Sequence, residues 1–92
     1  MYLEIVSPEA TLFAGEVTAV TVPGIDGEFQ MLNNHAPIVS LLQEGKVRIK
    51  GNVVLEEDYE DKFSKAANGD TVLAITSGTV EMKNNKVIVL AD

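Results

Sequence analysis

The sequence has no cysteine and no tryptophan, few basic residues and no long apolar run. Without cysteine the chain has no disulfide, thiolate nucleophile or zinc–thiolate site, so packing alone must hold its core. Seven Lys and Arg residues against 14 Asp and Glu residues give a formal net charge of -7. This charge argues against binding to nucleic acid or to an anionic membrane surface. No segment predicts membrane insertion, and the first residues carry no secretory signal, so residence inside the cell is expected.

Length and composition indicate one domain that covers residues 1–92. A chain of 92 residues has too little core to divide into two domains. Its hydrophobic fraction of 46% and charged fraction of 23% are those of a folded globular protein rather than a disordered tail.

Short runs with a period of two residues indicate strands. In Lys46–Lys50, basic side chains alternate with apolar ones, which is typical of a strand with one solvated face. The runs 17–22, 71–76 and 86–90 are rich in β-branched residues, as in strands within a two-layered sheet. Turn residues separate these runs, which predicts roughly ten short strands without a long helix. The predicted fold class is all-β, an antiparallel sandwich or barrel.

Three segments have a more specific local prediction. Asn84 and Asn85 lie between two such runs, and asparagine tolerates the positive φ of a type I′ hairpin turn. Residues 23–29 contain two glycines and predict a compact hairpin loop that exposes Glu28. Residues 56–67 fit either a helix, from apolar residues at three- and four-residue spacing, or a strand, from alternation. The neighbouring strands favour the strand interpretation.

No arrangement of residues predicts catalysis or metal binding. His35 is the only histidine and has no acidic partner at a telling spacing, so a turn histidine is the simpler interpretation. The acidic run 56–61 lacks the spacing of a calcium loop and is better explained as a solvated face. The glycines at 24 and 27 are not followed by a phosphate-binding helix. We therefore assign no catalytic residue, cofactor or metal.

The segment 23–37, PGIDGEFQMLNNHAP, resembles a signature of the epsilon subunit of F-type ATP synthase, P-G-x-x-G-x-F-G-I-L-P-N-H-A-P. The segments 3–8, 12–17, 45–49 and 77–91 also resemble strands of that family, so the resemblance covers nearly the whole chain. Gln30 and Asn33 depart from the Gly and Pro that are usual at these positions. Most members continue into two C-terminal helices, which makes a short form without this helical hairpin the expectation here.

The resemblance implies a flattened antiparallel β-sandwich rather than a barrel. It also implies a non-catalytic rotor subunit of the central stalk that couples ion flow to ATP synthesis. Such a subunit links the gamma subunit to the ring of c subunits within the assembly of alpha, beta, gamma, delta and epsilon subunits. By transfer of the motif, Glu28, Gln30 and His35 would contact the c-ring. This implies a peripheral position on the cytoplasmic face of a bacterial plasma or inner membrane.

The gamma-facing surface is predicted from residue character rather than from the motif. The strand that follows Pro37 offers apolar side chains, and we place the contact around Val39, Ser40 and Leu42. The alternative function is a stand-alone β-sandwich that binds a small ligand or a protein, with residues 23–37 at the mouth of a pocket.

Overall fold

The computed structural model describes residues 1–92 and consists almost entirely of strands. The expected all-β fold is confirmed, and the number of strands is ten. The strands are β1 (Tyr2–Val6), β2 (Thr11–Glu16), β3 (Ala19–Gly24), β4 (Gly27–Leu32), β5 (Ile38–Leu42), β6 (Gly45–Lys50), β7 (Phe63–Lys65), β8 (Thr71–Ile75), β9 (Gly78–Lys83) and β10 (Lys86–Ala91).

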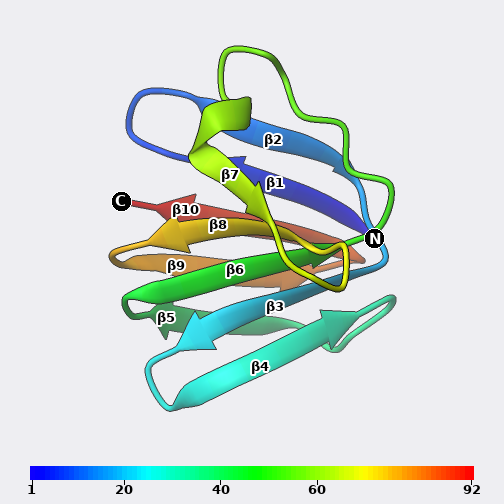
Figure 1. Cartoon of the computed structure of the whole chain (residues 1–92). Helices are drawn as coiled ribbons and strands as arrows, with labels where there is room; N and C mark the ends of the chain where they lie inside the picture. Colours follow the sequence, from blue (N-terminus) through cyan, green and yellow to red (C-terminus); the bar gives the residue numbers. More distant parts are fainter.

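The strands form one sheet that folds over on itself into two layers (Figure 1). One layer has the order β2-β1-β10-β9-β5, and the other has the order β4-β3-β6-β8-β7. The layers are joined at one corner, where Gly24 of β3 pairs with Leu42 of β5. The sheet is antiparallel as expected, except that β1 pairs with β10 in parallel. A parallel pair is possible here because the two strands are connected by most of the chain rather than by a tight turn.

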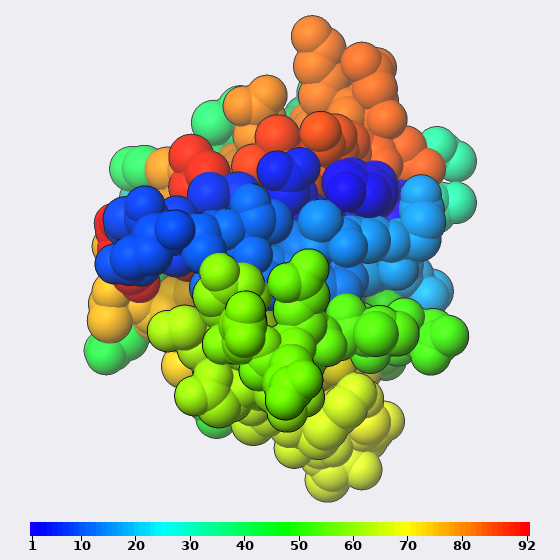
Figure 2. Space-filling view, turned by 90° about the horizontal axis from the view of Figure 1, so that it is seen from above, coloured from blue at the N-terminus to red at the C-terminus, as the bar shows by residue number.

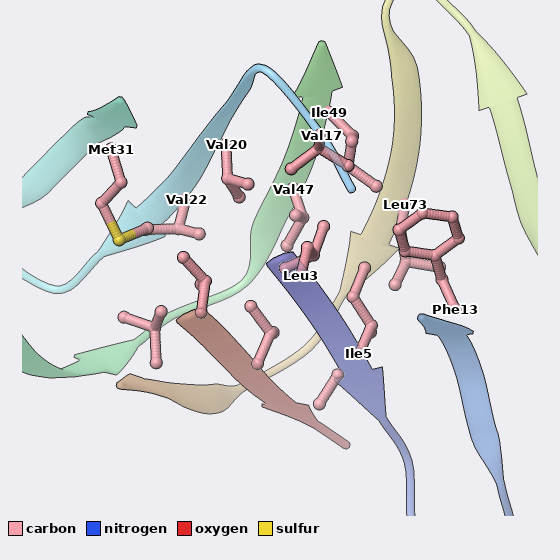
Figure 3. Packing of buried hydrophobic residues seen from close by; sticks show 14 of the residues in the cluster. Leu3, Ile5, Phe13, Val17, Val20, Val22, Met31, Val47, Ile49 and Leu73 are labelled. Carbon is pink, nitrogen blue, oxygen red and sulfur yellow. The ribbon is translucent and has the colours of Figure 1, made fainter. Parts of the chain in front are cut away.

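The core lies between the two layers and is built by alternation along the strands. In β1 the side chains of Leu3 and Ile5 are fully buried while their neighbours are half-buried. In the opposite layer Val20 and Val22 are fully buried on either side of the half-buried Thr21. Figure 3 shows these side chains pointing into the space between the layers. Each fully buried aliphatic side chain of this kind stabilises the fold by about 1.5–3 kcal/mol.

The β9–β10 hairpin forms as the sequence predicts. Lys83 pairs with Lys86, and the two turn residues Asn84 and Asn85 have φ values of 52° and 59°. Positive φ at both positions defines the type I′ geometry that matches the twist of the strands. The hairpin loop expected over residues 23–29 is shorter than predicted, because β3 and β4 pair up to Gly24 and Gly27 and leave only Ile25 and Asp26 unpaired.

Residues 56–67 form neither a regular helix nor one continuous strand. A single 3-10 turn (Glu60–Lys62) is followed directly by β7, whose Phe63 is buried and pairs with Leu73. Tyr59 precedes the turn and packs against the core. Tyr59 and Phe63 are four residues apart because one precedes the 3-10 turn and the other begins the strand that follows it. This explains why both the helical and the strand periodicity fitted this segment.

Residues 51–62 cover one side of the sandwich. Val53, Leu55 and Tyr59 of this segment pack against the core cluster. Figure 2 shows the segment, in green to yellow-green, lying beside the blue β1–β2 edge. The 3-10 turn is the only helical element, and no helix is long and apolar enough to cross a membrane.

Candidate protein interaction site

The three residues expected to meet the c-ring lie along β4 and the loop that follows it. Glu28 and Gln30 are two residues apart on the solvent face of β4, and His35 lies in the exposed loop 33–37. β4 pairs only with β3 and forms one edge of its layer. At about 3.3 Å per residue of extended strand, Glu28 lies roughly 13 Å from Leu32, the last residue of β4 before the loop. The structure thus arranges these side chains in a line along an edge and does not gather them at one point.

Glu28 on β4 makes a weak ion pair with Arg48 on β6, across the intervening strand β3. Its Oε2 lies 3.9 Å from Nε of Arg48 on β6, and the two side chains are 58% and 41% exposed. Exposed pairs of this kind contribute little to stability, because solvent and salt screen the charges. Glu28 is therefore available to a partner at small cost to the fold.

The substitution Glu28→Gln should leave the stability of the domain nearly unchanged. We expect the free energy of unfolding to change by less than about 1 kcal/mol, because only the exposed pair with Arg48 is lost. Urea denaturation of the variant and the parent chain measures the difference. A loss of more than about 2 kcal/mol would contradict the weak pair described above and would show that Glu28 has a structural role.

His35 is held by local contacts. Its Nδ1 lies 2.7 Å from the main-chain oxygen of Ala36, and the ring is exposed. No carboxylate forms an ion pair with it, and no serine hydroxyl is hydrogen-bonded to it. His35 therefore has neither the nucleophile nor the orienting acid that a histidine base needs in nucleophilic catalysis.

β5 presents an apolar surface on its outer side. Val39 and Leu41 point to solvent and are 76% and 58% exposed. Ile25, at the β3–β4 turn, donates its main-chain N–H to the oxygen of Leu41 and is itself exposed. Leu41 pairs with Thr79, and Thr79 pairs with the exposed Leu90, so these side chains form a row across three strands. We call the set of Ile25, Val39, Leu41 and Leu90 the apolar face.

Alternation along β5 corrects part of the predicted gamma contact. Val39 is the most exposed of the three expected residues, Ser40 is half-buried, and Leu42 is 4% exposed because its side chain points into the core. Leu42 cannot contact a partner through its side chain. Leu41 occupies the outward position instead, and the sequence prediction missed it because the direction of alternation in this strand was not established.

An open groove of about 630 Å³ lies next to the apolar face. Its lining includes Leu41, Leu90 and Gly78, together with Val6 and Pro8. Of the residues 23–37 expected to form the mouth of a ligand pocket, only Ile25 lines it. The groove is therefore a continuation of the apolar face.

The other charged segments singled out in the sequence remain on the surface. Lys46 and Lys50 are exposed on β6, and of the three basic residues on this strand only Arg48 makes an ion pair. The carboxylates of the run 56–61 are all exposed, and no group of three or more His, Cys, Asp or Glu side chains is arranged to hold a metal ion.

A two-layered β-sandwich with a polar edge along β4 and an apolar face over β5 defines a protein interaction domain. The comparisons with known proteins agree. The model of the family "ATP synthase, Delta/Epsilon chain, beta-sandwich domain" matches residues 1–92. The chain therefore belongs to this family, whose members are non-catalytic subunits of the ATP synthase central stalk.

The individual relatives are ATP synthase epsilon chains. The ATP synthase epsilon chain of Chlorobium limicola is 39% identical over 90 residues, which cover 98% of this chain and 86% of the relative. The epsilon chain of Campylobacter concisus is 38% identical over 92 residues, and the match spans all of this chain but 60% of that relative. The chain thus corresponds to most of some relatives and to little more than half of others.

Solved structures share the fold at low sequence identity. The match in the central stalk and c-ring of the Tetrahymena thermophila mitochondrial ATP synthase has a TM-score of 0.73 at 14% identity, covering 99% of this chain and 62% of that one. A chain of the Euglena gracilis mitochondrial ATP synthase gives a TM-score of 0.73 at 17% identity, covering 97% and 48%. At these identities the likeness supports the sandwich fold alone.

Proposed function

We propose that residues 1–92 act as one rigid domain that links the gamma subunit of an F-type ATP synthase to its c-ring. In this role the domain transmits rotation between the gamma subunit and the c-ring and catalyses no reaction itself. It lies on the cytoplasmic face of the membrane as a peripheral part of the assembly. The apolar face would bind gamma, and the edge formed by β4 and the loop 33–37 would meet the ring.

The observation that carries this proposal is the contrast between two neighbouring strands. β4 exposes Glu28 and Gln30, with Leu32 as the one large exposed apolar side chain at its end, whereas β5 exposes Val39 and Leu41. Only the loop 33–37 separates the two strands in the chain. The desolvated centre of a protein interface is enriched in apolar side chains, while charged side chains remain where water has access. The apolar face therefore suits a permanent contact, and the polar edge suits the hydrophilic loops of a membrane-embedded ring.

A close-packed sandwich is also a suitable transmitter of torque. Protein interiors are packed as densely as organic crystals and are hard to compress. The core cluster of 20 buried residues joins both layers, so a force applied at the edge along β4 reaches the apolar face through packed side chains. Rapid hydrogen exchange throughout the strands of the assembled stalk would contradict this explanation.

Paired variants test the two surfaces separately. We expect the double variant Glu28→Lys, His35→Ala to weaken attachment to the c-ring at least tenfold while gamma still binds. We expect the double variant Val39→Asp, Leu41→Asp to weaken gamma binding at least tenfold while the c-ring still binds. Co-purification with gamma and with detergent-solubilised c-ring measures both contacts. The matched control is Val54→Asp, since Val54 is 80% exposed and lies outside both surfaces.

Two results would overturn the proposal. If each pair of substitutions reduced both contacts equally while the variants stayed folded, the assignment of surfaces would be wrong. If the parent chain bound neither gamma nor the c-ring and its melting temperature rose with a metabolite, the small-ligand alternative would replace it.

A further inference from the structure

The side chain of Asn85 connects the β9–β10 turn to the loop 33–37. Its Oδ1 accepts a hydrogen bond from the main-chain N–H of Asn34 at 2.8 Å, and its Nδ2 donates to Oδ1 of Asn33 at 3.0 Å. These partners are 51 and 52 residues apart in the chain. A carboxamide is suited to this task because it offers an acceptor and a donor side by side.

The connection continues to the beginning of β1. Oδ1 of Asn33 also accepts a hydrogen bond from the Met1 nitrogen at 2.9 Å, and the main-chain N–H of Tyr2 donates to the oxygen of Asn85 at 3.1 Å. Asn33 and Asn85 therefore lie where the start of β1, the β9–β10 turn and the end of β4 meet. Asn33 is also one of the two departures from the family signature noted above.

The loop has few other restraints. All five residues from Asn33 to Pro37 are exposed, and the one main-chain hydrogen bond within this region runs from the N–H of His35 to the oxygen of Leu32. Asn34 has a φ of 62°, a conformation that costs energy unless surrounding contacts hold it. Asn85 supplies such a contact at the N–H of Asn34 itself.

We infer that Asn85, together with Asn33, positions the loop that carries His35, so that the β9–β10 turn sets the shape of the polar edge. This inference rests on the proposed function for the role of the loop at the c-ring. The hydrogen bonds themselves can be tested without any partner. Asn85 is then a positioning residue that acts through the loop and does not itself touch the ring.

The test compares two glycine substitutions in the same turn. Asn85→Gly removes both hydrogen bonds but keeps the turn, because glycine adopts a φ near 59° without strain. Asn84→Gly is the matched control, since Asn84 has a similar φ of 52° and its side chain makes none of the hydrogen bonds of this cluster. In the full chain we expect amide exchange at Asn34 to become at least tenfold faster in Asn85→Gly only.

The functional readout is affinity for the c-ring at unchanged stability. We expect Asn85→Gly to weaken ring binding three- to tenfold, to leave gamma binding as it is, and to keep its melting temperature close to that of Asn84→Gly. Asn85→Asp should be intermediate, because it keeps the acceptor for the N–H of Asn34 and loses the donor to Asn33. A general loss of structure would weaken both contacts and lower the melting temperature.

The outcomes separate this inference from the proposed function. Equal rates of amide exchange at Asn34 in Asn85→Gly and Asn84→Gly would overturn the inference, regardless of the measured affinity for the c-ring. Faster exchange with unchanged ring affinity would also overturn it, provided that His35→Ala weakens the ring contact. If His35→Ala has no effect on the ring, the proposed role of the loop fails, and faster exchange in Asn85→Gly still supports Asn85 as the residue that holds it.

Discussion

The Gly78→Ala variant is expected to lose about 3 kcal/mol or more of its folding free energy, because β9 has no room for a side chain at this position. A Cβ placed on Gly78 would clash with the main-chain oxygen of Leu90. The obstacle is backbone within a ladder, so it cannot rotate away as a side chain would. Gly78 also pairs with Leu42, and any shift of β9 would therefore disturb both of its neighbouring strands.

Gly15→Ala is the control for this experiment. Gly15 lies within β2, and a Cβ there would approach only the tip of the Phe13 ring, at 3.2 Å. A small movement of the ring can relieve this contact, so we expect a much smaller change. Urea denaturation followed by circular dichroism measures both variants. Equal effects at the two glycines would show that loss of glycine as such, rather than the clash with Leu90, is responsible.

Leu3→Ala is expected to destabilise the domain by about 2–5 kcal/mol, since it removes a fully buried side chain and leaves a cavity. A domain of this size has a total stability of roughly 5–14 kcal/mol, so the variant would lose a large part of it. Leu3 lies in β1, which is paired on both sides, with β2 and in parallel with β10. Thermal or urea unfolding at fixed pH measures the loss.

The same substitution at Leu41 separates stability from binding. Leu41 is 58% exposed, and we expect Leu41→Ala to change the folding free energy by no more than about 0.5 kcal/mol. Its effect should fall on the affinity for gamma, as Leu41 belongs to the apolar face. A large loss of stability at Leu41, or none at Leu3, would contradict the assignment of inner and outer positions.

The strands could be predicted from the sequence because each carries its pattern locally. The alternation in Lys46–Lys50 predicts β6 to within one residue, and the β9–β10 hairpin follows from the conformational tolerance of two asparagines. Residues 56–67 could not be predicted in the same way. Their aromatic residues meet the core from a 3-10 turn and a short strand, and the choice between these states depends on packing against other parts of the fold.

The candidate site could be predicted where its residues lie within the family signature, and less well elsewhere. Residue patterns indicated that Glu28 is exposed, but the inward direction of Leu42 depends on the pairing of β5 with β9, which the sequence does not reveal. The contact of Asn85 with Asn33 was not predictable at all. It joins residues 52 positions apart, and neither residue belongs to a recognisable motif for such a contact.

The parallel pairing of β1 with β10 also affects how the chain folds. Tyr2 and Lys86 are partners in that ladder, so one layer cannot form until the final strand is available. Contacts between such distant residues give a high contact order, which is associated with folding in milliseconds to seconds rather than microseconds. During synthesis the β1–β2 and β3–β4 hairpins can form early, whereas the other side of β1 remains unpaired until Lys86–Ala91 has left the ribosome.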